Sequence, residues 1–217
     1  MERDDFHRVM LVQLGDDGGD RFASGLLDEA LRQALAAYSQ SSPRLLSGTL
    51  TLVSTGEMQS LAALSGLMEV VELVFPYDAA ASLYRPYAQP WQFAWRDGSP
   101  LLWLGGQPVP QAGEVLHVTY TAAHTIQGLD EALATTLPVE HEAAISSGAA
   151  ALAANARALR LVEAHGSRTG EAEKWLACAA PLEKRFQAFL AGLRSGGRVR
   201  PPVWRKEMGW RLDGWDV

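Results

Sequence analysis

Two histidines near a group of carboxylates are the residues of this chain whose types could do chemistry. His141 and Glu142 begin like the zinc signature H-E-x-x-H, in which two histidines four residues apart on a helix bind one ion. Ile145 stands where the second histidine is needed, so the signature is incomplete. His124 could still approach His141 in space, with Glu140 or Glu142 as further ligands. A metal-dependent hydrolase that uses His124, His141 and the nearby acids is therefore one functional hypothesis.

Ser146 is the candidate nucleophile of the same stretch. The sequence AISSG at 144–148 resembles G-x-S-x-G, with Ala144 in place of the first glycine. A nucleophile elbow needs a strand, a sharp turn and then a helix. Ser146 instead falls two turns into an alanine-rich segment, so we expect it to be a small residue at a helix contact.

The acids of this stretch also fit the start of a helix. Glu140 and Glu142 would lie in its first turn, where carboxylates face the positive end of the helix dipole. Pro138 suits the first helical position, and Thr135 or Thr136 would cap the helix. On this interpretation the stretch is a strand end, a polar crossover and a capped helix.

Two helices are predicted near the N-terminus. Apolar residues over 4–14 recur at helical spacing. A longer apolar stripe from Leu26 to Tyr38 indicates a second helix, which Asp20 or Ser24 would cap and Pro43 would end.

Two more helices are predicted in the second half of the chain. The alanine-rich segment 138–165 is one of them. Its expected buried face consists of Ile145, Ala149, Leu152, Ala156, Leu159 and Val162. Small residues such as Gly148 would let another helix approach closely. The last helix is predicted over 171–193, with Pro181 kinking or restarting it.

The middle of the chain is rich in β-branched and aromatic residues and predicts short strands. The expected strands are 49–53, 68–75, 91–95, 101–104 and 115–121. Asp97-Gly98 predicts a hairpin turn, and five strands joined by turns favour an antiparallel meander. Trp91, Trp95 and Trp103 are expected to pack this sheet. His7 and His165 have no partner apparent from the sequence.

These elements predict an α+β fold that is mainly α, a helical bundle with an inserted small antiparallel β-sheet and an extended C-terminal tail. The bundle would consist of helices within 1–44 and 138–194, with the β insertion at 45–125. We therefore expect a single domain over 1–197 and a tail over 198–217.

Composition narrows the classes of function. The formal charge is −6, but 198–217 holds five basic and three acidic residues, which leaves −8 on the rest. An acidic body repels nucleic acid. A single cysteine, Cys178, excludes an internal disulfide and a cysteine-rich zinc site. We expect no membrane span and no export signal, because no long uncharged apolar run is present.

The tail interleaves tryptophans with basic residues. Its members are Arg198, Arg200, Trp204, Arg205, Lys206, Trp210, Arg211 and Trp215. The tryptophans are too sparse for a helical stripe. Three interpretations are open: the tail folds back on its own domain, it binds nucleic acid, or it is a docking arm. Trp and Arg are enriched at interface hot spots, which favours the docking arm.

Three stretches resemble head–tail connector (adaptor) proteins of tailed bacteriophages. In those proteins a strand ending in YTA-H leads through a TTLP linker into an alanine-rich helix. The matching residues here are Tyr120, Thr121, Ala122, His124, Thr135, Thr136, Leu137, Pro138, Glu142, Gly148 and Ala149–Ala154. Residues 26–44 resemble the early adaptor helix that ends in Tyr-Ser and then Pro-Arg. Residues 70–78, VVELVFPYD, are a weaker match.

The resemblance implies a structural virion protein at the head–tail junction, made in the host cytoplasm. Adaptors of this kind form a ring, usually of twelve copies, below the portal protein, and they extend the DNA channel towards the next neck or tail protein. DNA passes through the lumen without specific binding. The resemblance implies no catalytic residue, metal or cofactor, and it makes the tail a docking arm to the portal or to a neighbouring subunit.

Overall fold

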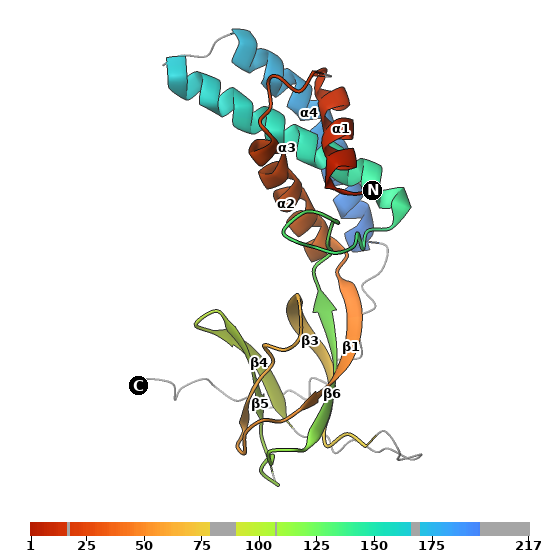
Figure 1. The fold of residues 1–217 in the computed structure, drawn as a ribbon, viewed down its shortest axis with the longest axis vertical. Coiled ribbons are helices and arrows are strands. Elements are labelled where there is room, and N and C mark those ends of the chain that lie inside the picture. Colours follow the sequence, from red (N-terminus) through yellow and green to blue (C-terminus); the bar gives the residue numbers. More distant parts are fainter. Residues whose placement is uncertain (17, 79–89, 107, 166–169, 196–217) are drawn as a thin grey trace.

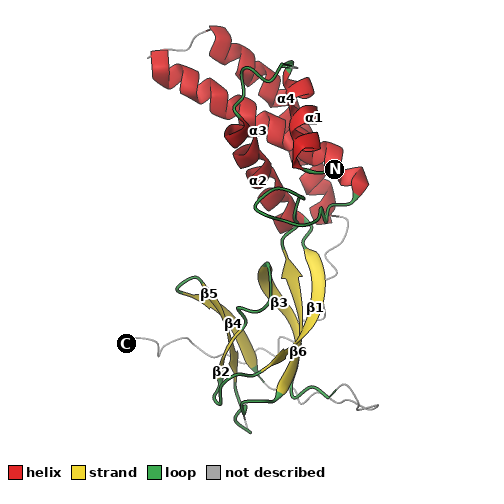
Figure 2. Ribbon diagram, in the orientation of Figure 1, coloured by secondary structure: helices red, strands yellow, loops and turns green. Residues whose placement is uncertain are grey.

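The computed structural model describes residues 1–16, 18–78, 90–106, 108–165 and 170–195. Helices gather at one end of an elongated molecule and strands at the other (Figure 1). The helices are α1 (Arg3–Leu14), α2 (Ser24–Ser41), α3 (Val139–His165) and α4 (Gly170–Ser195). The strands lie between α2 and α3 in the chain (Figure 2), so the predicted α+β, mainly α class with an inserted β region is confirmed. The tail, 198–217, lies outside the described residues.

The first two helices form where their apolar stripes predict them. Phe6, Met10 and Leu14 of α1 are buried in the bundle core, together with the stripe of α2 from Leu27 to Tyr38. The predicted side-chain cap of α2 is wrong, because its cap residue is Ala23 and no side chain bonds there. Burial of the stripe stabilises this helix without a polar cap.

The long helices α3 and α4 pack against each other along the bundle. The predicted buried face of α3 is right at Ile145 and Ala149 but wrong at Leu159, which is 63% exposed. Small residues on neighbouring sides of α3, such as Ala150 and Ala153, are fully buried instead. α3 therefore contacts helices on more than one side. A single apolar stripe would bury only one side of it. The predicted restart at Pro181 did not occur, since α4 is continuous through it.

The strands form two three-stranded antiparallel sheets rather than the predicted meander. One has the order β1 (Arg44–Thr51), β6 (Val115–Ala122), β3 (Leu67–Val74). The other has the order β2 (Met58–Ser60), β5 (Ser99–Leu104), β4 (Trp91–Arg96). Strand β2, three residues long, was not predicted from the sequence, and β1 begins earlier than the predicted strand at 49–53. The central strands are β6 in one sheet and β5 in the other. In a meander each strand would instead pair with the strands directly before and after it in the chain.

The hairpin turn between β4 and β5 is confirmed. Arg96 pairs with Ser99, and both Asp97 (φ 51°) and Gly98 (φ 75°) take the left-handed conformation. That geometry matches the right-handed twist of the two strands.

The two sheets enclose a second hydrophobic core, separate from that of the bundle. Leu102, Leu104, Leu116 and Val118 are fully buried in it. Of the tryptophans expected to pack the sheet, Trp91 packs partly against this core, while Trp95 is 53% exposed. No helix in the described part of the chain is long and apolar enough to cross a membrane.

We predict that Gly148→Leu lowers the free energy of unfolding by about 1–3 kcal/mol, since overpacking of a close contact costs that much. A Cβ on Gly148 would meet the ring of Phe186 on α4 at 2.6 Å. Gly192→Ala is the matched control, because nothing lies within 4 Å of a Cβ on Gly192 and alanine favours the helix. Denaturant unfolding of both variants measures the difference. Equal stabilities would contradict a close α3–α4 contact.

Candidate functional site: the joint between the bundle and the sheet

Two passages of chain connect the bundle to the strands, and the polar residues around them form the joint. The first passage, Ser42-Pro43, leads from α2 into β1, and the second, from Ala123, leaves β6 (Figure 1). We define the joint as Tyr38, Ser39, Ser42, His124, Thr125, Thr135, Thr136 and His141. Of the residues that resemble the adaptor motif, His124, Thr135 and Thr136 belong to the joint.

His124 connects the two passages. Its ring nitrogens lie 3.0 Å from the carbonyl oxygens of Ser42 and Thr136. Its backbone N–H donates to Oγ of Ser39 on α2 at 3.0 Å. The residue is buried. One side chain therefore ties the end of α2, the end of β6 and the end of the crossover together.

A neutral His124 can donate to only one of these two carbonyl oxygens. Nε2–H can donate to the Ser42 carbonyl, while Nδ1 accepts from the hydroxyl of Thr136, 3.3 Å away. Burial lowers the pKa of His124, and its two carbonyl contacts oppose that effect without overcoming it. His124 is thus a neutral structural hydrogen-bonding group at neutral pH.

Aromatic rings surround His141 beside the same passage. The hydroxyl of Tyr38 lies 2.7 Å from Nδ1 of His141, and burial raises the pKa of Tyr38, so the hydroxyl stays protonated and can donate. Phe189 of α4 stacks on Tyr38 and contacts His141 edge-on at 5.1 Å. His124 and His141 both contact the ring of Tyr38, with centroid distances of 4.9 and 5.6 Å.

Threonines hold the crossover that follows β6. Oγ1 of Thr136 accepts from the backbone N–H of Thr125 at 2.9 Å, and Oγ1 of Thr135 accepts from that of Gln127 at 3.0 Å. Thr135 also donates to the carbonyl oxygen of Met1. The prediction that Thr135 or Thr136 caps α3 is therefore wrong. Their hydroxyls bond to backbone N–H groups of the crossover and not to those of the first turn of α3.

The two acids at the start of α3 divide between surface and interior. Glu142 is buried, and its carboxylate pairs with the ammonium of Met1 at 2.6 Å. Glu140 is exposed. A buried carboxylate needs such a partner, because desolvation penalises an isolated charge.

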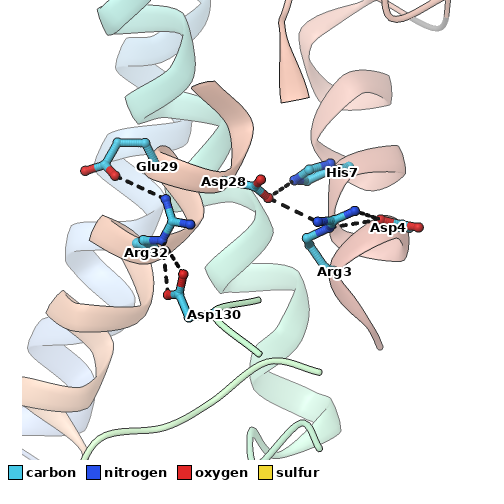
Figure 3. A network of polar contacts seen from close by, with 7 residues as sticks. All are labelled: Arg3, Asp4, His7, Asp28, Glu29, Arg32 and Asp130. Atoms are coloured by element: carbon cyan, nitrogen blue, oxygen red, sulfur yellow. Dashed lines mark hydrogen bonds and ion pairs between the residues drawn. The ribbon is translucent and has the colours of Figure 1, made fainter. Parts of the chain in front are cut away.

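A second polar network lies on the outside of the bundle (Figure 3). Nε2 of His7 contacts Asp28 at 2.9 Å, so the expectation that His7 has no partner is wrong. Nε of Arg32 donates to both carboxylate oxygens of Asp130 in the crossover, at 2.8 and 3.0 Å. Asp130 and Glu131 both take the left-handed conformation, and the contact with Arg32 holds this bend of the crossover against α2.

The histidines and the serine that the sequence offered for catalysis are bonded to other groups of the fold. The described residues hold no group of three or more His, Cys, Asp or Glu side chains that could bind a metal ion. Ser146 is fully buried, as expected for a helix contact, and donates to the carbonyl oxygen of Glu142. The hollow beside His124 measures about 230 Å³, and ligand pockets typically measure about 300–1,000 Å³. These observations favour a structural role for His124 and His141.

The sequence pointed to the tail as the binding site, and all eight residues named there lie outside the described residues. It did not identify the joint as a unit. Thr125 and Ser39, which bond to His124 or its neighbours, carry no signal except their closeness to the adaptor-like motif. The contacts join residues 85 positions apart in the chain, as His124 and Ser39 are, so local patterns do not reveal them.

No protein-family model matches the chain, and no curated protein matches it. Among solved structures, a chain from the neck of an empty GTA particle computed with C6 symmetry is similar. It shares 22% identity, the match covers 73% of this chain and 80% of that chain, and the TM-score is 0.29. A likeness at this level places the chain in no family, and we base the functional proposal on the residues described above.

We predict that the folded chain becomes less stable as the pH is lowered, because the buried His124 then takes up a proton. A histidine whose folded pKa lies below its unfolded value contributes fully above the unfolded pKa, about 6.5, and that contribution is lost as pH falls through the folded pKa. The free energy of unfolding of the native chain should therefore drop between pH 7 and 5. His124→Gln should show a shallower drop, and also lower stability at pH 7 by about 1–3 kcal/mol, because the amide does not reproduce both the Ser42 and the Thr136 contact of the ring. His117→Gln, on the outer face of β6, is the control. Identical pH profiles for His124→Gln and the native chain would contradict the assignment.

Proposed function

We propose that this chain is a structural component of a phage-type neck, an adaptor that forms a ring below the portal and joins the capsid to the tail. The observation that carries the proposal is the use of the adaptor-like motif. His124, Thr135 and Thr136 use their polar groups for hydrogen bonds within the joint between the sheet and the bundle. Residues that resemble a family of structural proteins thus do structural work in this chain.

The charge of the chain agrees with a channel that DNA passes through. Residues 1–197 hold 14 basic and 22 acidic residues, a net charge of −8. Phosphates are repelled by such a surface, so DNA can move past it without being retained. A protein that grips DNA would need a concentrated basic face.

The tail supplies the docking arm of this proposal. Aromatic burial would provide affinity, and the basic residues between the tryptophans would meet acids of the portal or a neighbouring subunit. The metal-dependent hydrolase is the competing hypothesis. It loses support because His124 is committed to two carbonyl oxygens and His141 to Tyr38.

The proposal predicts capture of this chain by the portal of the same particle, and loss of capture when the tail is removed after Gly197. Removing one aromatic anchor costs 2 kcal/mol or more, so Trp204→Ala with Trp210→Ala should weaken capture by at least about thirtyfold. Trp95→Ala is the control, because Trp95 is an exposed tryptophan of the β region. Circular dichroism accompanies the pull-down. A truncated chain that folds and still binds the portal with full affinity would contradict the hypothesis that the tail is a docking arm.

We also predict that the chain binds duplex DNA more weakly than about 100 μM at physiological salt, the weak end of non-specific DNA binding. Fluorescence anisotropy with labelled DNA measures this. Tighter binding that falls steeply with salt, and that disappears in Arg205→Ser/Lys206→Ser, would instead favour a nucleic-acid-binding tail.

A further inference from the structure

Strand β1 presents a long edge that nothing covers among the described residues. It is an outer strand of its sheet, and its eight residues pair with β6 without a register shift. From Leu45 to Thr51 it carries no charge. Leu45 is 66% exposed. Proteins normally protect such edges with charges, bulges or short strands.

The ladder shows which backbone groups face this free edge. The N–H of Leu52 donates to the carbonyl of Glu114 at 2.8 Å, so Leu52 points towards β6. Backbone groups alternate in direction along an antiparallel strand. The N–H and C=O groups of Leu45, Ser47 and Thr49 therefore point away from β6 and are available to another strand.

The other outer strands are protected in the usual ways. β3 has two register shifts in its pairing with β6, and it carries Glu69 and Glu72. β2 is only three residues long. β4 is short and ends at Arg96 beside the hairpin turn. β1 is thus the long, regular and uncharged edge of the two sheets.

The core next to β1 is incompletely covered. Leu46 and Leu50 point to the inner face of the sheet, yet both are only partly buried against the second core. Their partners on β6, Tyr120 and Leu116, are buried. An added strand with apolar residues on the same face would complete this side of the core.

The sequence after Pro202 has the alternation of such a strand. Counting tryptophans alone gives no period, but Trp204, Met208, Trp210 and Leu212 all occupy even positions. The charged Arg205, Glu207, Arg211 and Asp213 occupy odd positions, and Lys206 and Val203 are the two exceptions to the pattern. One face of a strand over 203–213 would therefore be apolar and the other charged.

We propose that residues 203–213 of one copy pair with the free edge of β1 in a second copy. This rests on the proposed function, because it specifies how neighbouring subunits of the ring recognise each other. The contact is head-to-tail, since the tail of each copy meets the edge of the next, and such contacts close into rings when the rotation permits. Backbone hydrogen bonds would supply binding, and Trp204 and Trp210 would cover Leu46 and Leu50.

The spacer before the tail strand is long enough to reach either the chain's own edge or that of a neighbour, and the choice of a neighbour rests on the proposed ring. Arg194, near the end of α4, donates to Oγ of Ser41 at 3.1 Å, three residues before β1 begins. The described chain therefore ends close to its own β1. Seven residues intervene, 196–202, which span about 23 Å when extended. Pro201-Pro202 keeps their end extended.

A mixing experiment with full-length chains tests the proposal. Ser47→Pro removes a free-edge N–H while sparing the ladder to β6, and outer strands tolerate proline. Trp204→Asp/Trp210→Asp disables the tail and leaves the edge intact. Each variant alone should be monomeric by sedimentation at chain concentrations up to about 1 mM, where a 4 kcal/mol contact is half occupied. Mixed together, they should form a one-to-one dimer and nothing larger, because each lacks one half of the repeating contact.

Controls and contrary outcomes separate the alternatives. Ser47→Val keeps the N–H and should associate like the native chain, within about twofold, whereas Ser47→Pro should associate at least about tenfold more weakly. Thr49→Lys provides a second edge block if Ser47→Pro fails to fold. A monomeric native chain, or a mixture that stays monomeric, would overturn the proposal. Loss of thermal stability in the tail variant, without any dimer on mixing, would place the tail on its own β1.

Portal capture of the native chain is measured in parallel, so that the two proposals can fail separately. A native chain that forms the mixed dimer but is not captured by the portal would contradict the adaptor function and leave the tail–edge contact standing. Capture of both the native chain and Ser47→Pro with equal strength, with no self-association of either, would contradict the contact and leave the adaptor function standing.

Discussion

The burial of polar groups at the joint is the constraint on which the rest of the structure depends. Two passages of chain attach the sheet to the helical bundle. Some backbone N–H and C=O groups in these passages have no partner in a helix or a strand. Leaving one such buried group unpaired costs about 1–3 kcal/mol. His124, Thr125, Thr135 and Thr136 pair those groups across the two passages, with one neutral imidazole at the centre. These bonds connect the end of α2, the end of β6 and the crossover between the two cores.

The remainder of the bundle follows from that anchorage. α3 begins directly after the crossover, and its small residues let α4 approach until Phe186 lies over Gly148. Close approach at this point brings Phe189 of α4 against Tyr38 and His141 beside the joint. Small residues on α3 and aromatic residues at the joint are therefore parts of one packing arrangement. The alanines of α3 are needed for contact on several sides, which explains why they outnumber its larger apolar residues.

Much of this fold could be predicted from the sequence, and what could not has a consistent physical cause. Helix periodicity placed all four helices, because burial of a stripe such as that of α2 is recorded in neighbouring residues. The hairpin at Asp97-Gly98 was predictable because its left-handed turn needs those residue types. The order of strands was not, since pairing of β1 with β6 depends on contacts about 70 residues apart. Leu159 was placed on the wrong side because α3 is contacted from several directions. Within the joint, the motif marked His124 and the threonines, but their hydrogen-bonding partners became visible only in three dimensions.

The joint and the edge of β1 differ in how their hydrogen-bonding groups are used. At the joint, the side chains of His124, Thr135 and Thr136 are hydrogen-bonded within the chain. In the sheet that contains β1, the pairing capacity of one edge is left unused although β3, two strands away, carries bulges and glutamates. Protection of one edge and not of the other is hard to explain by folding alone, because both edges invite the same unwanted pairing. The asymmetry is what a subunit needs if its neighbours must add on one side only. The joint then bears on assembly as well as on stability, since it connects that open edge to the bundle, and the angle between successive subunits determines whether a head-to-tail contact closes into a ring or continues as a filament.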